Sequence, residues 1–343
     1  MQYTCIQHIT AIEELLQSAE KIVITTHINP DGDAIGSTLA LYDFLVNNGK
    51  IVHAYISESA VPANMKFLNN SNKIKKYVPE QHDKYIYSAD AIFLLDLNSI
   101  DRVKTMGAAI QKSTARKVMI DHHIAPENIA DIFFVDSIAS STGELMYSLL
   151  KNLKSFGNSN INKNIAEAIY TAIITDTGNF RFNNTSARVF SVASELISLG
   201  VTPSDIYDIV YNQNSINSSK LLGLAYSSIE QVLDNKVVFM SISDEMLKQT
   251  GTTDADVEGF SDKTLTLKGA VVGVLFVELS HKNEIRISMR SRSGVNIREI
   301  AAKYSGGGHA NAAGLRLHEM TLDEAKKIIF EELKNLISLI KSN

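Results

Sequence analysis

The sequence predicts an α/β protein in which a doubly wound, mainly parallel sheet is followed by a smaller α/β domain. Three observations lead to this fold class. Apolar runs alternate with helical patterns in the first half of the chain, as is typical of parallel sheets. A mostly helical stretch at 142–230 comes next, and further apolar runs follow it. The chain has 343 residues, of which 45% are hydrophobic, and this is enough for two cores.

The elements of the first domain follow from short apolar runs and the patterns between them. KIVITTH (21–27) predicts a buried strand, and 33–49 predicts a helix that Gly49 ends. Four more strands are expected, at 51–57, 91–98, 117–123 and 132–135. AIYTAIIT, the apolar run before Asp176, is rich in alanine, which favours a helix over a strand.

The second domain is expected to contain strands at 236–243, 270–279 and 284–290 and a closing amphipathic helix from about Leu322. The Asn/Ser-rich stretch 212–219 favours a turn over a disordered linker. We therefore expect three parts in chain order. They are a metal-binding catalytic domain at 1–190, a helical linker at 191–225 and a substrate-binding domain at 226–343.

Composition narrows the class of protein. Cys5 is the only cysteine, so no internal disulfide can form, which fits a reducing compartment. No signal-peptide pattern and no apolar run of membrane-spanning length is present, and we expect a cytoplasmic protein without membrane association. The net charge of −5 disfavours a broad groove for long nucleic acid, but it allows a compact site for a small anion.

Metal-binding side chains follow four apolar segments of the first domain. Because ligands bind at the carboxyl ends of the strands in such sheets, we expect these side chains to converge. An alternative is that Asp33 caps the following helix and that Asp31 belongs to a turn. Four such coincidences favour a metal site over capping. The side chains are His27, Asp31, Asp33, Asp96, Asp121, His122, His123 and Asp176.

Imidazoles and carboxylates together suit Mn²⁺, Zn²⁺ or Fe²⁺. The set offers more ligands than one ion needs, which indicates two ions that share a carboxylate. Paired metal ions are the usual means of attacking a phosphorus centre.

A second signal lies near the C-terminus, in SGGGHANAAG (305–314). Gly306, Gly307 and Gly308 would let backbone N–H groups approach an anion, with His309 beside them. In the strand expected at 284–290, apolar residues alternate with polar ones that include Arg290. Seven Lys/Arg and two Glu lie between 281 and 316. Each feature alone has an ordinary interpretation, a turn for the glycine run and a solvated strand face for the arginines. The combination of the glycine run, the histidine and the arginines favours phosphate recognition.

These motifs resemble those of the DHH phosphoesterase family. The resemblance rests on HINPDGD (27–33), Asp96, DHH (121–123) and DTG (176–178). It implies that His27 and Asp31 bind one metal ion, that Asp33, His122 and Asp176 bind the other, and that Asp96 bridges both. It further implies that His123 contacts the substrate phosphate and that Asp121 orients a neighbouring histidine. Two Mn²⁺ ions and an in-line attack by a bridging hydroxide are expected.

SMRSR together with SGGGHANAAG resembles the DHHA1 domain of one branch of this family. The resemblance implies a cleft between the domains, in which Arg290, His309 and the glycine backbone hold the distal nucleotide. It also implies the activity of the short members, which degrade short oligoribonucleotides to 5′-mononucleotides and convert 3′-phosphoadenosine 5′-phosphate (pAp) to AMP. A homodimer is implied in the same way. Ser305 departs from the pattern, since many members have a further glycine there.

Several alternatives stay open. A phosphodiesterase acting on cyclic di-AMP or linear pApA would share both domains. A manganese pyrophosphatase, a RecJ-like exonuclease and a non-catalytic nucleotide-binding module are less favoured. For Arg181 and the Asn184-Thr185 pair, the start of a helix capped by Thr185 is favoured over lining of the cleft.

Overall fold

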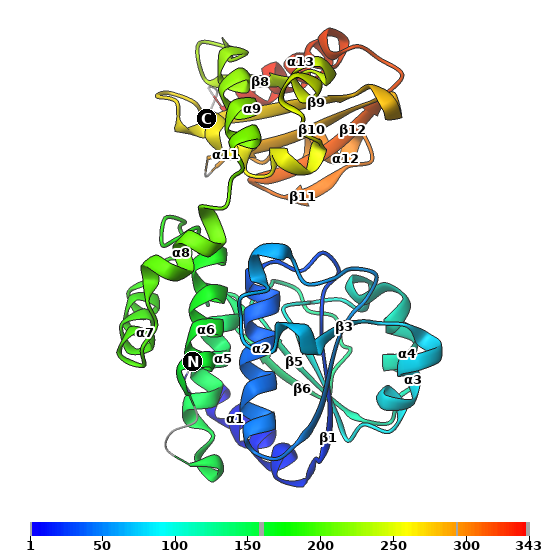
Figure 1. Ribbon diagram of the computed structural model, residues 1–343, viewed down its shortest axis with the longest axis vertical. Coiled ribbons are helices and arrows are strands. Elements are labelled where there is room, and N and C mark those ends of the chain that lie inside the picture. The colour runs from blue at the N-terminus through cyan, green and yellow to red at the C-terminus, as the bar shows by residue number, and fades with distance from the viewer. Residues whose placement is uncertain (1, 158–160, 293, 341–343) are drawn as a thin grey trace. The chain divides into compact units, whose positions relative to one another are not determined.

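The computed structural model describes residues 2–157, 161–292 and 294–340, and the chain divides into two compact units between Gln213 and Asn214 (Figure 1). Each unit has its own sheet and its own apolar core. The α/β class expected from the sequence is confirmed.

The first unit is built on a six-stranded sheet of order β3-β2-β1-β4-β5-β6, in which every neighbouring pair is parallel. The doubly wound parallel sheet is therefore confirmed. Only β3 was not expected, because it has three residues and two of them are lysines. The strands are β1 (Lys21–Thr26), β2 (Ile51–Ile56), β3 (Ile74–Lys76), β4 (Ala91–Leu95), β5 (Arg116–Asp121) and β6 (Ile132–Val135).

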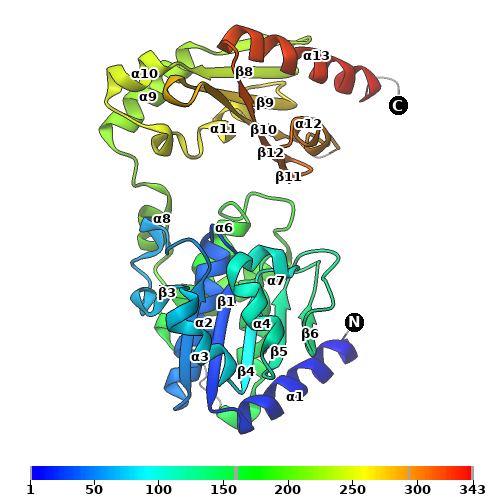
Figure 2. The same ribbon diagram turned by 90° about the vertical axis from the view of Figure 1, so that its right-hand side faces the viewer.

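Helices cover both faces of this sheet (Figures 1 and 2). Along β1, Ile22 and Ile24 point into the core that α1, α2, α5 and α6 share, whereas Val23 points into the core beneath α3 and α4. This alternation follows from the two-residue period of a strand, and both faces are apolar because both are covered. The helices are α1 (Gln2–Ser18), α2 (Gly32–Asn47), α3 (Pro79–Tyr87), α4 (Gly107–Lys112), α5 (Thr142–Asn152) and α6 (Lys163–Asp176).

Helices α2 and α6 lie unusually close together. A Cβ atom at Gly36 would lie 2.4 Å from the carbonyl oxygen of Ala168 and 2.9 Å from the Cβ of Ala172. Only glycine at this position allows such an approach. The contact matters for the site, because α2 carries Asp33 in its first turn and α6 ends at Asp176.

The helices expected to form a linker divide between the two units. Val189 and Leu196 of α7 (Ala187–Ser198) and Ile206 of α8 (Pro203–Tyr211) are buried in the first core. Leu221 and Ala225 of α9 (Ile216–Ser227) are buried in the second unit.

The second unit contains a mixed six-stranded sheet of order β11-β12-β10-β9-β8-β7. Strands β8 and β9 are parallel, and the other neighbours are antiparallel. Strands β8, β9 and β10 lie where strands were expected, whereas β7, β11 and β12 were not expected, since they are short or rich in glycine and alanine. The bounds are β7 (Glu230–Val232), β8 (Val237–Ile242), β9 (Val272–Leu279), β10 (Glu284–Ser291), β11 (Gly307–His309) and β12 (Ala312–His318).

Two groups of helices cover this second sheet. Phe276 of β9 packs with α12 and α13 on one face, and Leu275 packs with α9, α10 and the segment around α11 on the other. None of the helices described in either unit has the length and apolar character needed to cross a bilayer. The remaining helices are α10 (Asp244–Thr250), α11 (Phe260–Lys263), α12 (Arg298–Lys303) and α13 (Leu322–Ile340).

Candidate active site

His27 directly follows β1 and is buried. Its Nδ1 lies 2.7 Å from the carbonyl oxygen of Ile28, so this nitrogen carries the proton and donates to that oxygen. The Nε2 lone pair then faces two carboxylates, 3.3 Å from Asp96 and 4.0 Å from Asp31. Burial lowers the pKa of His27. A neutral imidazole held in this tautomer is suited to bind a metal ion through Nε2.

Asp31 and Asp33 lie at the start of α2 and have different surroundings. Asp31 is the N-cap, and its Oδ1 accepts from the backbone N–H groups of Asp33 and Ala34, so the alternative in which Asp33 caps the helix is wrong. The Asp31 side chain is 59% exposed. Asp33 is buried, and its two oxygens accept from the backbone N–H groups of Thr142 (2.7 Å) and Gly143 (2.8 Å) at the start of α5.

Asp96 follows β4 and lies between two groups of side chains. Its Oδ2 is 3.3 Å from the Nε2 of His27, whereas its Oδ1 is 3.6 Å from the Nε2 of His122. The hydroxyl of Thr142 donates to Oδ1 at 3.2 Å. Asp96 has a φ of 56°, in the left-handed region that residues other than glycine seldom adopt. Such strain is typical of functional positions.

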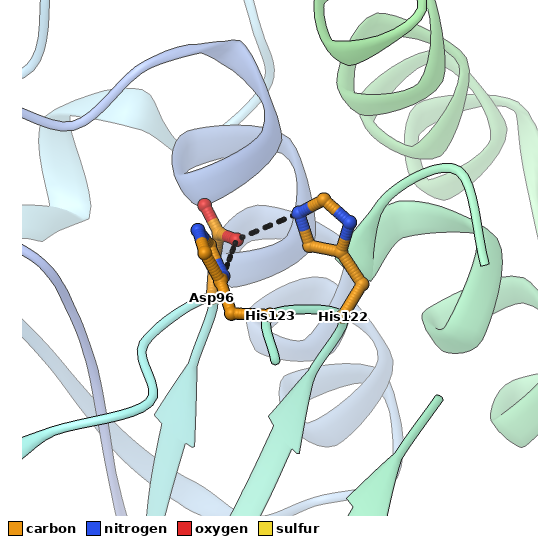
Figure 3. Close-up of side chains that lie close together, drawn as sticks. All are labelled: Asp96, His122 and His123. Atoms are coloured by element: carbon orange, nitrogen blue, oxygen red, sulfur yellow. Dashed lines mark ion pairs between the residues drawn. The ribbon is translucent and has the colours of Figure 1, made fainter. Parts of the chain in front are cut away.

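Asp121, His122 and His123 lie at the end of β5. The Nε2 of His122 is 3.5 Å from Asp176 and 3.8 Å from Asp33. Figure 3 shows both histidine rings beside Asp96, with the Nδ1 of His123 3.6 Å from Oδ1. The same Nδ1 lies 2.7 Å from the buried carboxylate of Asp121.

Burial controls the charge of this cluster. It raises the pKa of Asp33 and Asp96 well above the usual range, with neighbouring carboxylates adding to the effect. It also raises the pKa of Asp176 to about 7 and lowers the pKa of His122. In the part of the chain that the structure describes, no lysine or arginine nitrogen lies within 4.0 Å of Asp33, Asp96 or Asp176. A divalent cation would supply the missing positive charge.

The cluster contains two ligand groups that match the expected sets. One comprises His27, Asp31 and Asp96, and the other comprises Asp33, His122 and Asp176. Within each group, ligand atoms lie within 4.8 Å of one another. Asp96 also forms a third such group with His122 and His123, so one of its oxygens faces each expected set. These donors fit hard or borderline divalent ions such as Mn²⁺.

Asp176 is followed by a loop with unusual backbone. Gly178, Asn179 and Phe180 have positive φ angles of 56°, 58° and 63°. The side chain of Asn184 donates to the carbonyl oxygen of Asp176 at 3.0 Å and thereby closes the loop. The expectation that Thr185 caps α7 is wrong, because the cap is Ser186. The guanidinium of Arg181 lies 5.2 Å from the ring centroid of Phe182.

The expected substrate-binding arginine lies in the second unit. Ile285, Ile287 and Met289 are buried on one face of β10, and Arg290 is on the other face, as the alternation predicted. The Nε of Arg290 donates to Asp262 at 2.7 Å. The side chains of Arg286 and Arg292 donate to backbone carbonyl groups of neighbouring turns. These bonds hold the arginines in place, and Arg290 keeps a further N–H group with which to contact a ligand.

The glycine run lies at an edge of the second sheet. Gly306 and Gly308 have no room for a Cβ atom, since each would meet a backbone carbonyl oxygen at 2.3 Å. A Cβ at Gly307 would meet open space, and His309 is exposed beside it. Ser305 has a φ of 58°, a conformation that glycine adopts at lower cost.

The site includes residues that were not predicted. Thr142 and Gly143 donate to the cluster, and Arg102 lies 3.2 Å from the Nε2 of His123. The sequence SSTGE (140–144) carries a helix-start pattern, and a helix N-terminus is a common anion site, so Thr142 had a signal. No sequence signal pointed to Arg102, because its position depends on how the loop after β4 folds.

Comparisons with known proteins agree with this geometry. The model of the DHH family N-terminal domain matches residues 21–173, and the model of the DHHA1 domain matches residues 234–335. The chain belongs to the DHH family. Most of the candidate ligands lie within residues 21–173, the region that matches the DHH N-terminal domain, and Asp176 lies just beyond it.

Relatives align with nearly the whole of this chain. The bifunctional oligoribonuclease and PAP phosphatase NrnA of Bacillus subtilis is 28% identical over 90% of this chain and 93% of its own length. The cyclic-di-AMP phosphodiesterase PdeA of Listeria monocytogenes is 26% identical over 92% of this chain but only 48% of its own length. The crystal structure of an exopolyphosphatase-related protein from Bacteroides fragilis is 36% identical, covers 98% of both chains and has a TM-score of 0.91.

Proposed function

We propose that this chain is a phosphoesterase that hydrolyses short oligoribonucleotides to 5′-mononucleotides and pAp to AMP. The observation that carries the proposal is the position of Asp96, whose two oxygens face two separate ligand groups. A shared carboxylate is the usual arrangement around a metal pair that acts on phosphorus. The relative named oligoribonuclease and PAP phosphatase supports the choice of substrate.

His27 and Asp31 would hold one ion, Asp33, His122 and Asp176 would hold the other, and Asp96 would hold both. Two Mn²⁺ ions, when bound, supply Lewis-acid polarisation of phosphoryl oxygens and lower the pKa of water. The chain contributes the geometry. The Ile28 carbonyl orients His27, and the backbone N–H groups of α5 hold Asp33.

Arg290, Gly306, Gly307, Gly308 and His309 are proposed to bind the substrate nucleotide. Support comes from the exposed backbone at Gly307 and from the positive charge of the surrounding segment. A cytoplasmic homodimer is also proposed, and light scattering of the purified protein would test the assembly.

The test is a hydrolysis panel with Mn²⁺ on pAp, a diribonucleotide, a five-unit RNA, linear pApA, cyclic di-AMP and pyrophosphate. We expect turnover of pAp and short RNA, with cyclic di-AMP and pyrophosphate spared. An Asp96→Ala variant assayed in parallel excludes a contaminating phosphatase. No turnover of any substrate would contradict the proposal.

A second candidate, hydrolysis of a cyclic or linear adenine dinucleotide, is favoured by the relative named cyclic-di-AMP phosphodiesterase. Fastest turnover of cyclic di-AMP or pApA in the same panel would select it. The metal ligands would be the same in both cases, and the difference would lie in the substrate-binding residues.

A further inference from the structure

Arg102 lies beside the metal-ligand cluster and was given no role above. It belongs to η3 (Ile100–Met106), the short helix that follows Asp96. Its carbonyl oxygen accepts from the backbone N–H of Ile28 at 2.9 Å, which fixes it against the loop that carries His27. The side chain is half-buried. Arg102 is therefore held at the cluster by its backbone, and the residue as a whole is partly exposed.

The hydrogen bond between Arg102 and His123 determines which ring nitrogen of the histidine carries the proton. A guanidinium can only donate, so the Nε2 of His123 must accept from the Nη1 of Arg102. The proton of the neutral ring then sits on Nδ1 and is donated to Asp121 at 2.7 Å. Because both ring nitrogens are engaged, His123 has no N–H group left with which to contact a phosphate.

Arg102 has donors left over. A guanidinium carries five N–H groups, and the bond to His123 uses one of them. Among the described residues, no carboxylate lies within 4.0 Å of the Arg102 guanidinium, although the cluster beside it is rich in aspartates. An arginine without an acidic partner, positioned by a histidine, is well suited to bind an oxyanion.

We propose that Arg102 binds the phosphoryl group of the substrate, and that His123 and Asp121 are positioning residues that hold its guanidinium. The inference rests on the proposed phosphoesterase function. It replaces the direct phosphate contact expected for His123 with a chain from Asp121 through His123 to Arg102. The ligand class is a phosphate monoester or diester with unprotonated oxygens.

The first experiment compares Arg102→Ala with Arg116→Ala. Arg116 lies at the opposite end of β5 from the cluster and is a matched control. Inorganic phosphate binding to the Mn²⁺-loaded protein is measured by calorimetry, together with Mn²⁺ affinity and the KM for pAp. We expect Arg102→Ala to weaken phosphate binding and raise KM about 10- to 100-fold, as for the loss of charged hydrogen bonds. Mn²⁺ affinity should be unchanged or tighter, and Arg116→Ala should match the wild type.

Phosphate affinity can be measured without turnover, so the assignment of Arg102 and the proposed phosphoesterase function can fail separately. If the wild type binds phosphate through Arg102 but hydrolyses nothing in the panel, the proposed function is wrong and the assignment of Arg102 stands. If Arg102→Ala keeps wild-type phosphate affinity and KM, the assignment is wrong. Equal loss of Mn²⁺ affinity and phosphate affinity would also overturn it, since Arg102 would then support the metal ligands.

A second experiment tests the positioning role of His123. If His123 acts through Arg102, His123→Ala should raise KM, and the double variant with Arg102→Ala should be no worse than Arg102→Ala alone. His123→Gln offers an amide oxygen as acceptor and should recover part of the loss. Independent, multiplying effects of the two substitutions would show that His123 contacts the substrate itself.

Discussion

At the scale of single residues, Asp96 combines two properties that each cost free energy in the folded protein. It is a buried carboxylate among other carboxylates, and its φ of 56° places it in a costly conformation. Both costs become intelligible if the residue is held where its two oxygens face different metal ions.

Replacing Asp96 separates these two properties. We expect Asp96→Ala and Asp96→Gly to lose turnover equally, by about a thousandfold or more, since both remove the shared ligand. Asp96→Gly should be the more stable variant by about 1 kcal/mol, because glycine adopts a positive φ without steric cost. Turnover of pAp and denaturant unfolding measure the two effects. Near-normal turnover of either variant would refute the paired-metal arrangement, and Asp205→Ala on α8 is the control.

The raised pKa values of the cluster predict how pH affects stability. Asp33, Asp96 and Asp176 bind protons more tightly in the metal-free folded protein than in the unfolded chain. Their contribution to stability is therefore lost as pH rises through the folded pKa values, which for Asp176 is about 7. It is fully present only below the unfolded value of about 4.

Metal ions and protons compete for the same oxygens, so Mn²⁺ should raise the Tm more at pH 8 than at pH 6. Thermal melts in chelator and in Mn²⁺ at both pH values measure this difference. Asp176→Asn should reduce the pH dependence of the metal-free protein. A larger Mn²⁺ effect at pH 6 would contradict the assignment of these carboxylates as ligands.

At the scale of elements, the contact between α2 and α6 sets the geometry of the second ligand group. Asp33 and Asp176 come from different helices, and only the close approach at Gly36 brings them together. The packing of two helices is thus coupled to the chemistry at their ends.

Gly36→Ala should destabilise the protein by about 1–3 kcal/mol, because the new methyl group meets the α6 backbone. It should also weaken Mn²⁺ binding by displacing Asp176. Gly223→Ala in α9 is the matched control, since its Cβ would meet nothing within 4 Å and alanine favours a helix by about 1 kcal/mol. Denaturant unfolding and Mn²⁺ titration of both variants measure these effects. Equal behaviour of the two variants would show that the helix contact does not control the site.

The convergence of the candidate metal ligands was predictable, and the details around them were not. His27, Asp96 and His122 each follow an apolar run, and parallel strands bring such ends to one edge. Asp31 rather than Asp33 caps α2, and the sequence does not distinguish the two because either aspartate could form the local turn at the start of the helix. The bond between Arg290 and Asp262 joins distant segments, which no local pattern reveals.

At the scale of the whole molecule, the chain combines two units with separate cores and separate candidate roles. All predicted metal ligands lie before Gln213, and Arg290 and the glycine run lie after Asn214. Metal binding and binding of the substrate nucleotide by the second unit should therefore be separable by cutting the chain between these residues.

The fragment 1–213 should fold and bind Mn²⁺ with an affinity close to that of the full chain, because it contains every proposed ligand. It should lose turnover of pAp, because Arg290 and the glycine run, which are proposed to bind the substrate nucleotide, are missing. Circular dichroism, calorimetry and the hydrolysis assay test these points, with fragment 214–343 as the partner sample. Full turnover by 1–213 alone would remove the second unit from the proposed function.

The parallel arrangement of the first sheet also has a practical use. Strands β1, β4 and β5 carry candidate ligands at the carboxyl edge of this sheet, and the turns at the amino edge carry none of them. The exposed turn at Gly49, just before β2, lies at that edge, with open space around it. A strand of six residues spans about 20 Å. A fluorescent label or a surface tether attached at this turn would stand that far from His27, which makes single-molecule recording of the enzyme feasible without touching its chemistry.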